Sequence, residues 1–263
     1  MLKYLGQVIL GPPGAGKTTF CSSMSRFLVH HKKIPILINL DPGNIANTYK
    51  HRLDICQIVN SYEISSELHL GPNSSIFYSM EYFQKNLDWF EKKMKIILEV
   101  PFDLYFLFDL PGQIELYTHH FVIRKIIKRI LKKNIRLGAI VLNDSIFWKD
   151  KTVIFYILII SISIMLNIEL PHLTLLSKTD LFFYKNSANI KILKNFQNFI
   201  LQDMFFQNSI FFWANKYYKS LNDIIFDFSS LSIIPINNFD NSDIKKIFKN
   251  LNNMLIDKKF HSK

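Results

Sequence analysis

Close to its start, the chain of 263 residues contains the stretch Gly11-Pro12-Pro13-Gly14-Ala15-Gly16-Lys17-Thr18. The stretch follows an apolar run that ends at Leu10 and precedes a segment of helical periodicity, so we expect it to join a strand to a helix. Phosphate oxygens need several backbone N–H donors converging on one point, which favours a loop of small residues at a helix N-terminus. The pattern predicts a nucleotide-phosphate loop in which Lys17 reaches the β- and γ-phosphates and the Thr18 hydroxyl binds Mg²⁺.

The segments around this loop predict an α/β fold. Short aliphatic runs alternate with longer segments of helical periodicity, which is typical of parallel strands joined by helices. The expected strands are Gln7 to Leu10, Ile36 to Leu40, Leu104 to Asp109, Ala139 to Leu142, Leu173 to Leu176 and Ser232 to Ile236. Because most of these runs are continuously apolar, we expect helices on both faces of a mostly parallel sheet. This three-layer arrangement is that of a P-loop NTPase.

Apolar residues at steps of three and four predict the helices. Phe20, Met24, Phe27 and Leu28 mark a first helix that ends before Pro35. The stripe from Ile76 to Met94 marks one helix, which we expect to begin near Asn73 or Ser74 because either can cap it. A C-terminal helix is capped by Asn241 or Ser242, and its inward residues are Ile244, Ile247, Leu251 and Met254.

The composition indicates one folded intracellular domain over residues 1–263, with an insertion at about 182–230 that contains a helix from Ile192 to Phe205. The 32 basic residues exceed the 21 acidic ones and give a net charge of +11, but they are scattered along the chain. We therefore expect no direct nucleic-acid contact.

The apolar segment from Val153 to Leu166 is shorter than the roughly 20 residues that cross a bilayer, so it is interpreted as a buried core helix and no membrane partner is expected.

A second motif, Asp109-Leu110-Pro111-Gly112-Gln113, follows the apolar run from Leu104 to Phe108. Its position puts Asp109 at the end of a buried strand, where nucleotide hydrolases hold magnesium. A glutamine side chain can donate and accept at once, so Gln113 can orient an attacking water. Glu115 is a further candidate for polarising that water, and a solvated surface carboxylate is the alternative interpretation.

A third motif, Ser177-Lys178-Thr179-Asp180, follows the predicted strand from Leu173 to Leu176. A carboxylate can accept from both N1–H and the 2-amino group of guanine, whereas adenine presents an acceptor at N1. The motif therefore favours GTP over ATP, with Asp180 reading the base. Its first residue is Ser177 where asparagine is usual.

Together these residues resemble the GPN-loop GTPases, and most of all the second eukaryotic paralogue. The namesake triplet is present as Gly71-Pro72-Asn73. Further matching stretches are Asn39-Leu40-Asp41-Pro42, Met80-Glu81-Tyr82, Asn86-Leu87-Asp88-Trp89, Glu115-Leu116-Tyr117-Thr118-His119-His120 and Glu169-Leu170-Pro171-His172. Two departures stand out, because Ser74-Ser75 replace the usual glycine pair and Gly43 replaces a common alanine.

The resemblance implies a set of site residues. The catalytic candidates are Asp41, Asn73, Asp109, Gln113 and Glu115. The nucleotide-binding candidates are Gly11, Pro12, Pro13, Gly14, Ala15, Gly16, Lys17, Thr18, Thr19, Ser177, Lys178 and Asp180. The Mg²⁺ ligands would be Thr18 and Asp109, with GTP or GDP as the nucleotide.

The resemblance also implies a biological role. It is that of a GTPase acting as a dimeric switch, either a homodimer or a heterodimer with a related GPN-loop GTPase. The implied process is the assembly and nuclear import of RNA polymerase II, with polymerase subunits or assembly factors as partners and with cytoplasmic residence and shuttling to the nucleus. In the family the GPN loop reaches across the dimer, so Asn73 would lie near the other subunit's γ-phosphate.

Two other functions fit part of the pattern. One is a GTP-binding assembly scaffold in which the nucleotide is structural and turnover is negligible. The other is a small-molecule kinase, because the phosphate loop suits that class too. The sequence shows no arginine-rich lid for a second phosphorylated substrate, which speaks against the kinase.

Overall fold

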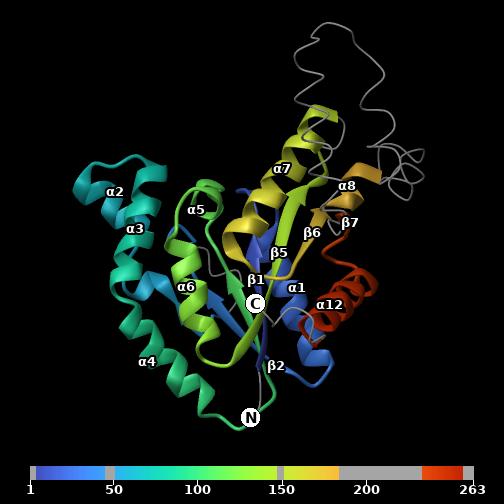
Figure 1. Ribbon diagram of the computed structural model, residues 1–263, viewed down its shortest axis with the longest axis horizontal. Coiled ribbons are helices and arrows are strands. Elements are labelled where there is room, and N and C mark those ends of the chain that lie inside the picture. The colour runs from blue at the N-terminus through green and yellow to red at the C-terminus, as the bar shows by residue number, and fades with distance from the viewer. Residues whose placement is uncertain (1–3, 45–50, 147–150, 184–232, 257–263) are drawn as a thin grey trace, which may run out of the picture.

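The computed structural model describes residues 4–44, 51–146, 151–183 and 233–256. Their centre is a seven-stranded sheet with the order β3-β2-β4-β1-β5-β6-β7, and every neighbouring pair is parallel. Helices cover both faces of this sheet (Figure 1). The predicted three-layer α/β fold is thereby confirmed.

The strands are β1 (Tyr4–Leu10), β2 (Ile34–Asn39), β3 (Leu53–Asp54), β4 (Leu104–Asp109), β5 (Ile135–Asp144), β6 (His172–Ser177) and β7 (Ile233–Pro235). The helices are α1 (Lys17–His30), α2 (Ser61–Leu68), α3 (Pro72–Lys85), α4 (Leu87–Leu98), α5 (Glu115–Thr118), α6 (Val122–Leu131), α7 (Lys151–Ile168), α8 (Thr179–Phe183) and α12 (Asn241–Ile256), with a 3₁₀ turn at Ile55–Gln57. All six expected strands are present. The sequence analysis missed β3, because two residues are too few to show a periodicity.

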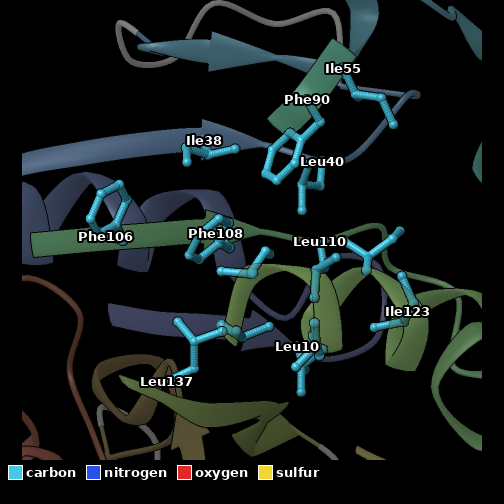
Figure 2. Close-up of a cluster of buried hydrophobic side chains, with 14 of the residues drawn as sticks. Leu10, Ile38, Leu40, Ile55, Phe90, Phe106, Phe108, Leu110, Ile123 and Leu137 are labelled. Carbon is cyan, nitrogen blue, oxygen red and sulfur yellow. The ribbon is translucent and has the colours of Figure 1, made fainter. Parts of the chain in front are cut away.

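Two apolar clusters hold the layers together. The larger lies between the sheet and helices α3, α4, α5, α6 and α7, and Figure 2 shows its interior, where Phe106 and Phe108 of β4 lie among aliphatic side chains such as Leu10 and Ile38. The smaller packs α1 and α12 on the opposite face. Since both faces of the central strands are buried, the strands have the continuous apolar sequences from which they were predicted.

One predicted helix is in fact two. Asn86 separates α3 from α4, because its backbone angles, φ −106° and ψ 24°, leave the helical region, and its side chain donates to Tyr82 O at 2.9 Å. The apolar stripe continues across the break, and Phe83, Leu87 and Phe90 are all buried. Periodicity alone therefore could not reveal the interruption.

The predicted helix caps were wrong. Helix α3 begins at Pro72 with Gly71 as its cap, rather than at Asn73 or Ser74, since proline suits the first helical position where no N–H is needed. Asp240, instead of Asn241 or Ser242, caps α12 by accepting from Ser242 N at 2.8 Å. On α12, Leu255 is buried and Met254 is only half-buried, so the inward stripe ends one residue later than expected.

Helix α7, which the sequence analysis interpreted as a buried core helix, is only partly buried. Leu158, Ser161 and Ile164 are buried, but Tyr156 and Leu166 are each 58% exposed. Within the described ranges, no helix combines the length and the hydropathy that crossing a membrane requires. Residues 184–232, which hold most of the predicted insertion and its helix from Ile192 to Phe205, lie outside the described residues.

Gly138 provides a test of the packing between β5 and α12. A Cβ at this position would lie 2.6 Å from Leu251 Cδ1 and 2.9 Å from Leu251 Cγ, and Leu251 is fully buried. We predict that Gly138→Ala lowers the free energy of unfolding by about 1 to 3 kcal/mol, through overpacking. This change in the free energy of unfolding is measured by urea denaturation, with circular dichroism as the signal.

Gly43→Ala is the matched control, because a Cβ there meets its neighbours at 3.4 to 3.6 Å, which is ordinary contact. A Gly138→Ala midpoint equal to that of Gly43→Ala would contradict the packing described for this helix.

Candidate nucleotide-binding site

The phosphate loop joins β1 to α1 as predicted. Gly11, Gly14 and Gly16 all have positive φ angles, of 143°, 77° and 85°. Gly11 also lies tightly against β5, since a Cβ there would lie 2.2 Å from Leu142 O. The loop can therefore lie against the neighbouring strand only with glycine at this position.

Lys17, the first residue of α1, is buried beneath the loop. Its Nζ donates to the carbonyl oxygens of Gly11 and Pro12, each at 3.1 Å. Burial lowers the pKa of Lys17, and the carboxylates of Asp109 and Asp41 oppose that shift. A bound phosphate would add negative charge beside this ammonium group, so the site favours an anion.

Thr18 and Asp109, the two residues predicted to hold Mg²⁺, are joined by a hydrogen bond. The Thr18 hydroxyl donates to Asp109 Oδ2 at 3.0 Å, and Asp109 is the buried last residue of β4. A hydroxyl and a carboxylate oxygen suit Mg²⁺, which keeps several waters and takes few protein ligands when phosphates supply the rest. The described residues hold no cluster of three or more His, Cys, Asp or Glu suited to a metal. These two residues fit the ion.

The loop after β4 packs directly on the phosphate loop. A Cβ at Gly112 would lie 2.9 Å from Pro13 Cα and 3.0 Å from Lys17 Nζ. Glycine is thus required where the two backbones touch, which the predicted turn had not indicated. This contact brings the residue after it, Gln113, beside the phosphate loop.

Three of the predicted catalytic residues gather around one cavity. Gln113 Nε2 donates to Asn73 Oδ1 at 3.1 Å, which joins the GPN triplet to the loop after β4. Both residues, with Glu115, line a cavity of about 460 Å³ that reaches Pro13 and the side of α7. Glu115 is exposed at the start of α5, so its role as an ordinary surface carboxylate stays open.

Asp41 lies near Lys17 in a braced turn after β2. Its Oδ1 accepts from Gly43 N at 2.9 Å, and its own N–H donates to Asn39 Oδ1 at 3.1 Å. The buried Asn39 also donates to Asp54 Oδ1 at 2.8 Å, so it ties this turn to β3. Burial raises the pKa of Asp41, while the Gly43 N–H and Lys17 lower it.

The loop after β6 is tied to the phosphate loop by Ser177. Its hydroxyl lies 2.7 Å from Ala15 O and 3.0 Å from Asn143 O, so the serine provides a direct link between the two loops. Lys178, at a φ of 58°, pairs with Asp144 at 2.5 Å. Asp180 follows on the first turn of α8 and is exposed, which leaves its carboxylate accessible to a base.

Sequence reasoning missed two residues at this site. Asn238, in the loop between β7 and α12, is buried with its Nδ2 3.5 Å from Gly16 O, and its Oδ1 has no hydrogen-bond partner among the described residues. Tyr117 is fully buried, and its pKa is raised well above the usual value by burial and by the carboxylates of Asp41 and Asp109. Tyr117 stood in a quoted motif, whereas no sequence signal marked Asn238.

Comparisons with known proteins agree with this geometry. A family described as "Conserved hypothetical ATP binding protein" matches residues 9–256. GPN-loop GTPase 2 of Danio rerio is 38% identical, over 93% of this chain and 78% of that protein. The GPN-loop GTPase 2 homolog of Dictyostelium discoideum is 35% identical over 94% and 78%, and GPN-loop GTPase 3 of Saccharomyces cerevisiae is 33% identical over 94% and 90%.

The fold is also similar to that of a solved structure, a GTPase in apo form from Pyrococcus abyssi. The TM-score is 0.79, with 19% sequence identity, and the match covers 96% of this chain and 98% of that one. At this identity the likeness concerns the fold alone.

Lys17 provides the test of the phosphate site. We predict that Lys17→Ala weakens GTP binding at least about tenfold, because a charged hydrogen bond to the phosphates is lost. Calorimetric titration in the presence of Mg²⁺ measures the affinity, and Lys92→Ala on the exposed face of α4 is the control. An unchanged affinity for Lys17→Ala would show that the phosphates bind elsewhere.

Proposed function

The chain belongs to the family of GPN-loop GTPases, and on that premise we propose that it binds GTP with Mg²⁺ and hydrolyses it to GDP and phosphate. The observation that carries the proposal is the convergence of three groups at the carboxyl edge of the sheet. The ammonium group of Lys17 lies beneath the phosphate loop, the Thr18 hydroxyl bonds to Asp109, and Gln113 lies beside Pro13. A cation, a metal pair and a water-orienting amide are the parts that phosphoryl transfer to water requires.

Each residue has a role in this proposal. Lys17 binds the β- and γ-phosphates, and Thr18 and Asp109 hold Mg²⁺, which when bound neutralises charge on the phosphate oxygens. Gln113 orients a water, whose oxygen bonds to the γ-phosphorus as the bridging oxygen leaves with GDP and the water protons end on the phosphate products. Asp41, close enough to Lys17 to affect its pKa, helps to keep that ammonium group charged.

Base recognition rests on Asp180. The matched family is described as ATP-binding, whereas the similar proteins are named GTPases. The chemistry of a carboxylate favours guanine, whose N1–H and 2-amino group both donate to it. Lys178 is anchored by Asp144 and Ser177 by the phosphate loop, so the neighbouring Asp180 starts from a fixed position.

The dimeric switch and the role in RNA polymerase assembly belong to the same proposal and rest on the family resemblance. A partner's contribution is supported by the arginines, because none of the five, Arg26, Arg52, Arg124, Arg129 and Arg136, lies in one of the three nucleotide motifs. Arg124 also pairs with Glu169, Arg129 pairs with Glu91, and Arg136 donates to Leu255 O. These three are therefore engaged away from the phosphate loop. Transition-state charge would then be met by Lys17, Mg²⁺ and groups from a second subunit.

Phosphate release from GTP tests the activity. We expect steady release that requires Mg²⁺ and is lost in Asp109→Asn, because the amide is a poorer metal ligand than the carboxylate. Tight GTP binding without release would favour the scaffold, and release only with an added acceptor would favour the kinase. Sedimentation of the same samples should show a dimer whose stability differs between GDP and a slowly hydrolysed GTP analogue.

Competition binding tests whether Asp180 recognises the guanine base. We predict that Asp180→Asn loses at least about tenfold of its preference for GTP over ATP, because one charged hydrogen bond contributes about 1.5 to 3 kcal/mol. The variant should gain affinity for xanthosine triphosphate, whose additional carbonyl can accept from the new amide. If the order GTP, xanthosine triphosphate, ATP is unaltered, another residue reads the base.

A further inference from the structure

Helix α6 brings together basic residues that the sequence analysis treated as scattered. Residues 121–133 contain no acidic residue, and their basic residues are Arg124, Lys125, Lys128, Arg129, Lys132 and Lys133. The apolar side of α6, which includes Ile123, Ile126 and Ile130, is buried in the larger core cluster, so the basic residues share the outer side. Figure 1 shows α6 on the same face of the sheet as α3 and α4. The outer side of α6 is therefore a continuous band of positive charge.

Two carboxylates from neighbouring segments hold the edges of this band. Each of them is shared by two cations, and the pairs are Glu169 with Arg124 and Lys128 on one edge, and Glu91 with Arg129 and Lys133 on the other. Exposed ion pairs of this kind add little to stability. Two carboxylates among six basic residues also leave an excess of four positive charges within the band.

An exposed ridge runs along the middle of the band. At roughly 100° per residue, Phe121, Lys125 and Lys132 lie within about 40° of one another around the helix, between the two paired edges. We call these three residues the α6 ridge. All three are exposed, Phe121 by 61%, and neither lysine has an ion-pair partner among the described residues. Both ammonium groups are therefore accessible to a partner.

A hollow of about 260 Å³ lies beside the N-terminal end of the ridge. Phe121 and Lys125 line it together with Glu81 and Lys85 of α3. An aromatic ring with two cations and one carboxylate can receive an apolar side chain from a segment that carries negative charge.

We propose that the α6 ridge docks an acidic segment of another protein, which lies extended along the helix with an apolar residue in the hollow. Lys125 and Lys132 are seven residues apart, which is about 10.5 Å along a helix. An extended chain covers that distance in about three residues, so carboxylates at positions i and i+3 reach both lysines. A second copy of this chain is disfavoured at this face, because each copy carries a net charge of +11. The surface lies outside the nucleotide site and goes beyond the proposed GTPase function.

The shape of the surface favours a peptide over a nucleic acid. A helix that enters a groove of DNA has phosphates along both flanks, and the flanks of α6 carry Glu169 and Glu91. Single strands bind in basic grooves where successive bases stack on aromatic rings, whereas Phe121 is the single aromatic residue in 121–133. A peptide along the ridge needs neither feature.

Fluorescence anisotropy of the nucleotide-free protein at low ionic strength tests the proposal. The probe is a fluorescein-labelled peptide, Phe-Ser-Glu-Gly-Ser-Glu, and its control peptide has glutamine in place of both glutamates. We expect the acidic peptide to bind more tightly than the control peptide. Lys125→Glu/Lys132→Glu should weaken its binding roughly tenfold, because two attractive contacts become repulsive.

Lys245→Glu/Lys249→Glu is the matched control variant. It makes the same change of charge at exposed positions of α12, which packs on the opposite face of the sheet, and should keep the affinity. The neutral variant Lys125→Gln/Lys132→Gln should lose affinity as well, by a smaller factor. Phe121→Ala should weaken binding of the acidic peptide, but not of a version with alanine in place of phenylalanine.

Three results would overturn the proposal. One is equal affinity for the acidic and the glutamine peptide, and another is an equal loss of affinity in the two charge-reversed variants. The third is tighter binding of a labelled single-stranded or duplex oligonucleotide that is lost in Lys125→Glu/Lys132→Glu, which would assign the ridge to a nucleic acid. GTP turnover does not enter any of these measurements, so failure of the proposed hydrolase and failure of the docking surface are distinguishable.

Discussion

The site depends on the register between β1 and β4. Ile9 is paired with Asp109, and Asn39 of β2 is paired with the same residue from the other side. Because these strands are parallel and end at the same level, the phosphate loop after β1, the Asp41 turn after β2 and the Gln113 loop after β4 leave the sheet together. The 3.0 Å bond from Thr18 to Asp109 joins the first and third of these loops. A slip of one residue in the register would turn Asp109 to the opposite face.

Contacts between loops then hold the segments that follow β4, β6 and β7 against the phosphate loop. Gly112 touches Pro13, Ser177 lies in contact with Ala15 O, and Asn238 lies close to Gly16. Charges of opposite sign also meet at the phosphate loop, since the carboxylates of Asp41 and Asp109 lie near the buried ammonium group of Lys17. Two carboxylates and one ammonium group leave a net negative charge, which favours a divalent cation, and that cation together with Lys17 favours the phosphates of a nucleotide.

The departures from the family pattern have local explanations. Ser177 replaces asparagine, yet its hydroxyl reaches the phosphate loop directly. Ser75, at the position of a usual glycine, bonds to Pro72 O and steadies the turn that presents Asn73. At Gly43 a methyl group would meet Asp41 Oδ1 at 3.4 Å, so glycine and alanine are both compatible with this turn.

The sequence by itself determined six of the seven strands, the phosphate loop and the family, because a buried parallel strand needs continuous apolar residues and a phosphate cradle needs glycines at fixed spacing. It did not determine the break at Asn86, the cap at Gly71 or the exposed face of α7, since periodicity reports which side of a helix is apolar and not where the backbone turns or what covers it. Only the tertiary structure brought Asn238 to Gly16 and Asn73 to Gln113. Those pairs are 222 and 40 residues apart, and only the folded positions of their loops bring them together.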